Sequence, residues 1–304
     1  MIAYLGPEGT FAQQALLTFS HDASVPYPSV LAVLDAVRRG ETEAGLVPIE
    51  NSVEGGVSAT LDSLASGQTL MIGREVLLPV QFNLYARSAV RLEDVRRVLS
   101  HPHAIAQVRG WLAANLPQAS ATEGGSTAAA AAEVADPASR YDAAVCAQVA
   151  GERYGLVAIA RDIADNASAV TRFVLVTRPG EPPAPTGADK TTLVAYMRAD
   201  RPGSLMEILE QFAVRGVNLC RIESRPTKTG LGNYCFSIDL EGHVREPRVA
   251  EAMLGLHRVC EDVVYLGSYP RADQVRPQIG VGFQEADFAA AKRWYNDLLD
   301  PGDD

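Results

Sequence analysis

The chain has 304 residues, of which 47% are hydrophobic, enough to build more than one folded core. Its 27 basic and 37 acidic side chains give a formal net charge of −10, which argues against nucleic acid or an anionic membrane as the main partner. A small anionic ligand remains compatible with this charge, because an arginine or a helix N-terminus acts locally.

The cysteines and the N-terminal residues indicate the compartment. Cys146, Cys220, Cys235 and Cys260 are scattered and lack Cys-x-x-Cys spacing, which predicts free thiols in a reducing cytoplasm and indicates neither a disulfide framework nor a zinc site. Residues 2–5 already read as a strand, so no secretory signal is expected. No apolar run reaches membrane-spanning length. We therefore expect a cytoplasmic protein that does not enter a membrane.

A stretch rich in proline and glycine divides the chain. It begins near Arg178 and ends at Asp189, and such a composition continues neither a helix nor a strand. We expect a first domain over residues 1–180, a linker over 181–189, a second domain over 190–270 and a C-terminal tail over 271–304.

In the first domain, strands and helices alternate. Strands are expected at 2–5, 44–49, 69–78, 80–86, 141–146, 157–160 and 173–176. Helices are expected at 10–19, 30–39, 59–66, 92–99, 104–115 and 126–134, with a last one ending at 154. This alternation favours an α/β fold with mostly parallel sheets, and the length allows two lobes with a cleft between them.

The second domain has a βαββαβ pattern. Strands are expected at 191–197, 217–223, 234–240 and 263–269, and helices at 203–214 and 246–259. This order predicts a ferredoxin-like fold. The tail carries an amphipathic helix over residues 283–299 with Phe288, Trp294, Leu298 and Leu299, and its sequence does not indicate a function.

Three segments of the first domain place a hydroxyl side chain at an expected helix start. They are residues 6–11, which contain Thr10, residues 50–56, which contain Ser52, and residues 124–127, which end in Ser126 and Thr127. Exposed backbone N–H groups at the positive end of a helix bind carboxylate or phosphate. Ordinary capping explains any one of them, so both interpretations stay open. The chain lacks the glycine-rich phosphate motifs of nucleotide-binding proteins.

Two further polar groups lie at strand ends. Glu50 and Asn51 follow a buried strand, where α/β folds place their ligands, and Glu50 fits a general acid or base, a hydrogen-bond anchor or a structural ion pair. Thr171 and Arg172 lie at the mouth of an apolar strand, before Phe173. His101 reads as a turn histidine.

In the second domain, the loop into the first helix and the second strand are the candidate site. The helix N-terminus at Gly203, Ser204 and Leu205 is suited to the carboxylate of an amino acid. Asn218 or Glu223 is suited to the ammonium group. A purely structural module is the alternative.

Taken together, these segments resemble the prephenate dehydratase family over residues 1–270. The motifs that carry the resemblance are Gly-Pro-Glu-Gly-Thr-Phe at 6–11, Val-Pro-Ile-Glu-Asn-Ser at 47–52, His101-Pro102 with Ala104 and Gln107, Ser-Thr-Ala at 126–128 and Thr-Arg-Phe at 171–173. Glu-Ser-Arg-Pro at 223–226 resembles the amino-acid-sensing ACT domain. The chain departs from the usual motifs at Val108, at Ala169 and in Gly-Ser-Leu-Met at 203–206.

The resemblance implies a two-lobed catalytic domain, similar to periplasmic binding proteins, that converts prephenate to phenylpyruvate without a metal or other cofactor. Thr171 is implied as the catalytic residue that helps the ring hydroxyl leave, with Arg172 holding a carboxylate or pairing structurally and Glu50 orienting Asn51 or assisting proton transfer. Thr10, Asn51, Ser52, Ser126, Thr127 and Phe173 are implied to bind substrate.

The ACT resemblance implies feedback by phenylalanine and a homodimer or homotetramer formed through this domain. Its effector site is expected at Gly203, Ser204, Leu205, Asn218, Leu219, Glu223 and Ser224. Two other functions stay open: an arogenate dehydratase, and a non-catalytic two-lobed ligand-binding or sensor protein. The pairing of Thr171 with Arg172 argues against a pure binder, which needs no proton donor.

Overall fold

The computed structural model describes residues 1–227 and 234–299, so the last five residues of the expected tail lie outside it. Contacts divide the chain into two compact units. The first unit contains Met1–Thr60 and Val76–Val174, and the second contains Leu61–Glu75 and the chain from Leu175 onward. A short early segment, residues 61–75, thus belongs with the C-terminal part of the chain, which the sequence did not suggest.

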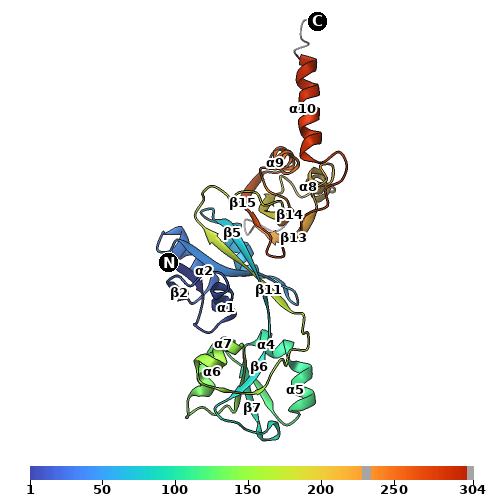
Figure 1. Cartoon of the computed structure of the whole chain (residues 1–304). Coiled ribbons are helices and arrows are strands. Elements are labelled where there is room, and N and C mark those ends of the chain that lie inside the picture. Colours follow the sequence, from blue (N-terminus) through green and yellow to red (C-terminus); the bar gives the residue numbers. More distant parts are fainter. Residues whose placement is uncertain (228–233, 300–304) are drawn as a thin grey trace. The chain divides into compact units, whose positions relative to one another are not determined.

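One mixed sheet begins at the N-terminus (Figure 1). Its order is β2 (Ser24–Tyr27), β1 (Ile2–Leu5), β3 (Ala44–Asn51), β11 (Val170–Thr177) and β5 (Met71–Pro79), and β4 (Gly55–Gly56) pairs with β3. The helices along these strands are α1 (Phe11–Leu17), α2 (Val30–Arg38) and α3 (Ser58–Leu64). Strand β2 was not predicted, because it is a short, half-exposed edge strand containing proline.

A second sheet lies wholly within the first unit. Its order is β10 (Val157–Ala160), β6 (Asn83–Ala86), β9 (Ala143–Cys146), β7 (Arg97–Ser100) and β8 (Ser120–Glu123). Its helices are α4 (Pro102–Gln107), α5 (Arg109–Asn115), α6 (Thr127–Ala135) and α7 (Gln148–Arg153). Strand β7 pairs in parallel with β8 and β9, whereas β6 is antiparallel to β9 and β10. The expectation of mostly parallel sheets is therefore wrong for this sheet.

Two helix predictions in this region are corrected. Residues 92–99 form a short 3-10 turn, Leu92–Asp94, followed by β7, because Val98, Leu99 and Ser100 are buried in a central strand. The helix expected over 104–115 is divided at Val108, whose backbone leaves helical geometry. Beyond this break the Asp165 carboxylate accepts the N–H groups of Gly110 and Trp111, each at 2.8 Å, and so satisfies the new helix start.

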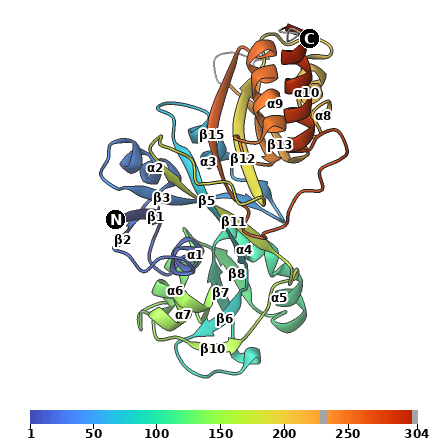
Figure 2. The same cartoon turned by 45° about the horizontal axis from the view of Figure 1, so that its top comes forward.

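The C-terminal unit contains a four-stranded antiparallel sheet in the order β13-β14-β12-β15. The chain runs β12 (Asp189–Tyr196), α8 (Ser204–Ala213), β13 (Leu219–Pro226), β14 (Tyr234–Glu241), α9 (Pro247–Val259) and β15 (Asp262–Pro270). Helices α8 and α9 pack on one face of the sheet (Figure 2) and share its apolar core. Helix α10 (Glu285–Leu299) follows, and its Trp294, Tyr295, Leu298 and Leu299 are exposed.

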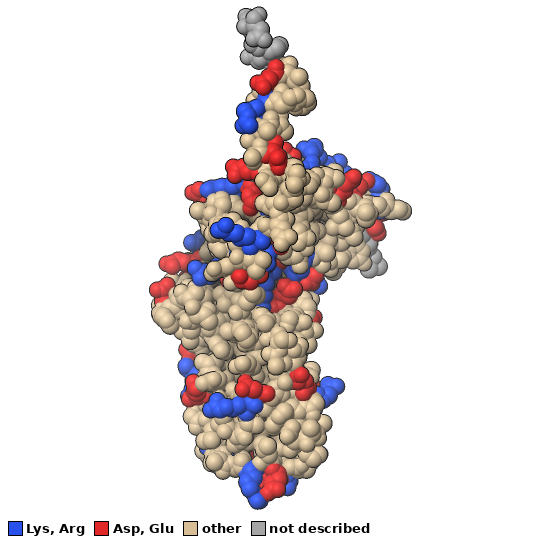
Figure 3. Space-filling view, turned by 45° about the vertical axis from the view of Figure 1, so that its right-hand side comes forward, with Lys and Arg blue, Asp and Glu red and all other residues tan. Residues whose placement is uncertain are grey.

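On the face drawn in Figure 3, acidic and basic side chains lie in small mixed groups, separated by wide areas of uncharged residues. Within residues 1–227 and 234–299, no helix is both long and apolar enough to cross a membrane. Cys146, Cys235 and Cys260 are buried and Cys220 is exposed, all as free thiols.

Candidate active site

The first unit contains a cleft of about 600 Å³. Its walls come from elements of both sheets: the loops after β1 and β3, strand β11, and the starts of helices α4 and α6. Of the residues expected from the sequence, Thr10, Asn51, Ser126, Thr127, Thr171 and Phe173 line it. Folding thus brings together side chains as far apart along the chain as Thr10 and Phe173, which are separated by 163 positions.

Thr171 and Asn51 form a polar pair in this cleft. The Asn51 amide nitrogen donates to the Thr171 hydroxyl oxygen at 3.0 Å. The amide oxygen of Asn51 accepts the backbone N–H groups of Val53 at 2.8 Å and Glu54 at 3.3 Å, which fixes the orientation of the amide. Because the Thr171 oxygen is the acceptor here, its own proton is available to a ligand in the cleft.

The loop after β3 is clamped onto β11 just before Thr171. The backbone N–H of Ser52 donates to the Val170 carbonyl, and the Val170 N–H donates to the Ser52 hydroxyl oxygen, both at 2.9 Å. Ser52 does not line the cleft and does not start a helix, since α3 begins at Ser58. Thr171 lies inside β11 rather than at its mouth, because Val170 already pairs as strand.

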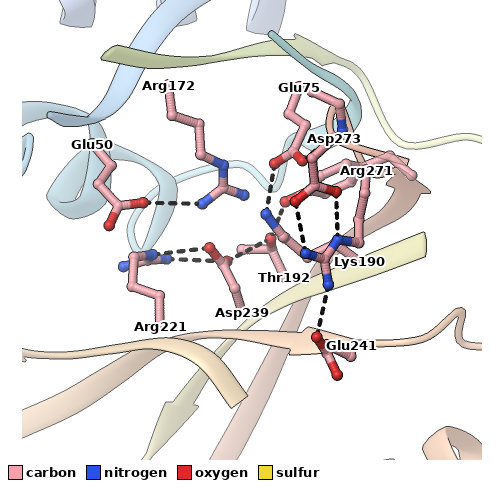
Figure 4. Close-up of polar contacts among 12 residues, drawn as sticks. Glu50, Glu75, Arg172, Lys190, Thr192, Arg221, Asp239, Glu241, Arg271 and Asp273 are labelled. Carbon is pink, nitrogen blue, oxygen red and sulfur yellow. Dashed lines mark hydrogen bonds and ion pairs between the residues drawn. The ribbon is translucent and has the colours of Figure 1, made fainter. Parts of the chain in front are cut away.

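Arg172 and Glu50 face each other away from the cleft lining (Figure 4). Successive side chains of a strand point to opposite faces, so Thr171 and Phe173 share the cleft side and Arg172 takes the other. The Arg172 guanidinium, buried at 5% exposure, donates to a Glu50 carboxylate oxygen at 3.5 Å. This geometry matches one of the alternatives given for each residue, a structural ion pair. The catalytic roles of Arg172 and Glu50 stay predictions.

Hydroxyl groups and a helix start supply the anion-binding part of the cleft. Ser126 caps α6: its hydroxyl oxygen accepts the Ala129 N–H at 2.9 Å, so its proton stays available to a ligand. The Thr10 hydroxyl donates to the Leu5 carbonyl at 2.9 Å and can accept from a ligand. Among the lining residues, all of which belong to the described chain, there is no lysine or arginine, and the hydroxyl of Ser126 with the start of α6 offers neutral donors to a bound anion.

The rest of the cleft is apolar. Phe11 and Phe82 line it and pack edge to face, with ring centroids 5.5 Å apart. Phe173 and Val80 complete this wall and are buried. The departures at Val108 and Ala169 lie in the core behind the second sheet and do not line the cleft. A site with aromatic walls on one side and hydroxyl and amide donors on the other suits a six-membered ring that carries oxygen substituents.

A carboxylate to which sequence reasoning assigned no role, that of Glu54, contacts helix α4. Glu54 accepts from the Gln107 amide at 3.3 Å and pairs with His103 Nδ1 at 2.9 Å, and all three residues line the cleft. His101 also lines it, where a turn histidine was expected. The motif containing His101 and Gln107 was noticed, but nothing in the sequence shows that Glu54, more than forty residues earlier, reaches it.

The surroundings of His101 favour its neutral form. Burial, reinforced by the adjacent His103, lowers the pKa of His101 below its ordinary value, against the opposing effect of Glu54 and Glu123. Its Nδ1 also accepts the backbone N–H of His103 at 3.3 Å, which requires that nitrogen to be unprotonated. The proton of the neutral ring is then on Nε2.

This lowered pKa predicts a pH dependence of stability. Above about pH 6.5, the ordinary histidine pKa, His101 is neutral in both folded and unfolded states and contributes no slope. As the pH falls below that value, His101 takes up a proton in the unfolded chain but not in the folded chain. The free energy of unfolding therefore decreases, by at most about 1.4 kcal/mol per pH unit. We expect the free energy of unfolding, measured by urea titration, to decrease less between pH 8 and pH 5 in His101→Gln than in wild type. Equal slopes would contradict the assignment.

The C-terminal unit contains a second, smaller cavity of about 270 Å³. Gly203, Ser204, Leu205 and Ser224 line it, as the sequence suggested. Asn218, Leu219 and Glu223 do not line it. Leu219 and Glu223 lie in β13 and pair with residues of β14, and Glu223 accepts from Arg221 at 3.5 Å.

Further side chains, outside the effector set expected from the sequence, complete this cavity. They are Met197, Asp200, Arg201, Met206, Tyr234 and Phe236. Gly203 has φ +92°, a left-handed backbone that favours glycine, and precedes the first turn of α8. The cavity therefore combines a helix N-terminus, a carboxylate, a guanidinium and apolar side chains, a set that suits a zwitterion with an apolar side chain.

Comparisons with known proteins show which family the chain resembles. Residues 2–181 match the family model of prephenate dehydratase. A prephenate dehydratase from Amycolatopsis methanolica is 51% identical over 296 residues, covering 96% of each chain. The crystal structure of prephenate dehydratase from Arthrobacter aurescens in complex with L-Phe is 49% identical, with a TM-score of 0.94 over 98% of this chain and 99% of that one. A structure described as GqqA, a novel type of quorum quenching acylase, is 30% identical, with a TM-score of 0.78 over 88% and 97%.

A mixed α/β enzyme with a ring-sized cleft is thus the class that the fold and site define. The family model covers residues 2–181, and the identity and structural similarity to the named relatives extend over nearly the whole chain. The chain belongs to the prephenate dehydratase family.

Proposed function

We propose that the chain is a lyase that converts prephenate to phenylpyruvate in the cleft of the first unit, in phenylalanine biosynthesis. The observation that carries this proposal is the Thr171 hydroxyl, whose oxygen accepts from Asn51 and whose proton is left to the ligand. The 51% identity with a named prephenate dehydratase supports the same reaction.

The reaction needs positioning and a donor to the leaving group. The bond from the ring carbon to its carboxylate breaks, its electron pair enters the ring, and the bond to the ring hydroxyl breaks on the far side, giving carbon dioxide, water and phenylpyruvate. Aromatisation of the ring provides the driving force. The hydroxyl leaves as water only if it gains a proton, and the hydrogen bond from Thr171 stabilises the charge that develops on that oxygen.

The remaining groups of the cleft orient prephenate, which carries two carboxylates. Ser126, Thr127 and the start of α6 donate to a carboxylate. Phe11 and Phe82 contact the ring. Gln107 and the neutral His101 offer further donors on the wall formed by α4. We assign the two sheets of this part to the two lobes of a periplasmic-binding-protein-like catalytic domain, whose closure excludes water.

We assign residues 190–270 to an ACT regulatory domain that binds phenylalanine in the second cavity. Its strand order β13-β14-β12-β15 with two helices on one face supports the ferredoxin-like fold. The α-carboxylate would bind the start of α8, Asp200 would bind the ammonium, and Phe236 with Met197 would contact the ring. The relative crystallised with L-Phe supports this effector. Pairing of such domains would make the protein a homodimer or homotetramer.

The experiment is an assay of phenylpyruvate formation by the purified protein with prephenate, with and without phenylalanine and with and without a chelator. We expect turnover that the chelator leaves unchanged and that phenylalanine suppresses. If the protein turns over arogenate but not prephenate, it is an arogenate dehydratase. If it binds prephenate without forming product, it is a non-catalytic binding protein. The acylase-like relative is the more distant one, at 30% identity, and no contact in the cleft favours its activity.

A further inference from the structure

Two attachments join helix α3 to the sheet of the C-terminal unit. The Arg225 guanidinium of β13 contacts the Asp62 carboxylate of α3 through two nitrogens, at 2.8 and 2.7 Å, and both side chains are about one-fifth exposed. The Tyr196 hydroxyl at the end of β12 donates to the Ala65 carbonyl, just after α3 ends. A charge-assisted pair and a hydrogen bond thus hold the C-terminal part of this helix.

Both attachments come from residues next to the second cavity. Ser224 lines the cavity and Arg225 is its neighbour in β13. Met197 lines the cavity and Tyr196 precedes it. Ser224 and Arg225 point to opposite faces of β13, and Met197 directly follows the end of β12 at Tyr196. The backbone that forms the cavity wall therefore also positions the two side chains that hold α3.

The other end of α3 belongs to the active-site cleft. Val57 and Ser58, at its start, line the cleft. The fully buried Thr60 donates its hydroxyl to the Pro48 carbonyl at 2.5 Å, and the Val57 N–H donates to the Ile49 carbonyl at 2.8 Å. These bonds fix α3 to the end of β3, three residues before Asn51, which in turn holds Thr171.

Helix α3 is therefore one continuous element whose start belongs to the first unit and whose remainder belongs to the second. Seven residues of helix span about 10 Å and move as a body. We propose that α3 carries the effector signal: occupation of the second cavity shifts Tyr196 and Arg225, and α3 transmits this shift to the loop that holds Asn51 and Thr171. The inference rests on the function proposed above and identifies the route of its regulation.

The test uses Asp62→Asn in the full chain. Asp62 touches neither cavity, so we expect basal turnover and phenylalanine affinity, measured by calorimetry, to stay within about twofold of wild type. Inhibition by saturating phenylalanine should fall by at least tenfold, within the range of a coupling of 1–3 kcal/mol. The double variant Asp62→Asn with Tyr196→Phe should be almost insensitive to phenylalanine. The charge-reversed pair Asp62→Arg with Arg225→Asp should recover part of the inhibition.

Glu181→Gln is the matched control. It removes the pair with Arg245, which lies in the same unit but away from α3, and should leave inhibition unchanged. Hydrogen exchange gives a readout that does not depend on turnover: phenylalanine should change the protection of residues 58–64 in wild type but not in Asp62→Asn.

The outcomes separate this inference from the proposed function. If wild type turns over prephenate and Asp62→Asn is inhibited as strongly as wild type, α3 does not carry the signal while the enzyme assignment stands. Absence of any phenylalanine effect in wild type would also overturn the inference, since no signal would exist to carry. If wild type shows no turnover but phenylalanine still changes hydrogen exchange of residues 58–64 in wild type and not in Asp62→Asn, the enzyme assignment is refuted and the coupling through α3 stands.

Discussion

Replacing Thr171 with alanine is expected to lower kcat by roughly 100- to 10,000-fold while KM changes little. The side chain is 9% exposed and lines the cleft, so its loss removes the donor without opening the fold. The Asn51 amide that now points at Thr171 would point at a void. Steady-state kinetics of phenylpyruvate formation measure the effect.

Two variants distinguish the hydroxyl from the shape of the side chain. Thr171→Ser keeps the hydroxyl and should keep most of the activity. Thr171→Val keeps the volume, loses the hydroxyl, and should be as poor as alanine. A valine variant with near-normal kcat would show that Thr171 shapes the cleft and that another group assists the leaving hydroxyl.

Replacing Glu75 with alanine is expected to destabilise the second unit by about 3–5 kcal/mol. Glu75 of β5 is paired with Lys190 of β12 at 2.9 Å, and the two side chains are 1% and 11% exposed (Figure 4). Glu75 also accepts the Ala272 N–H at 2.9 Å. Its removal leaves a buried lysine charge without this partner and also removes the acceptor of the Ala272 N–H. Urea unfolding of the variant measures the loss.

The double variant Glu75→Leu with Lys190→Met tests the cause. Removing both charges together should restore much of the lost stability, because the desolvation cost of the pair disappears with it. A single Glu75→Ala variant within about 1 kcal/mol of wild type would contradict the interpretation, as would a double variant less stable than the single one.

Sequence patterns predicted the elements where a local signal was strong. Helix α2 and helix α6 begin at serines that cap them and were expected within one residue. The strands β12 and β14 were expected within about two residues. Patterns failed where burial overrode periodicity: the spacing of Leu92, Val95 and Leu99 suits a helix, yet the residues from Val98 on form a buried central strand.

The sequence by itself determined the family, because five short motifs in register point to one reaction and a sixth to a sensing domain. Of its candidate residues, Thr10, Asn51, Ser126, Thr127, Thr171 and Phe173 line the cleft, whereas Ser52 does not. Tertiary structure decided which of the neighbouring polar residues enter the cleft. Thr171 and Arg172 are adjacent, but strand alternation turns one into the cleft and the other onto Glu50. It also decided the contacts of Glu54 with α4 and of Asp62 with β13, since these depend on chain segments 50 and 160 residues apart that no local pattern relates.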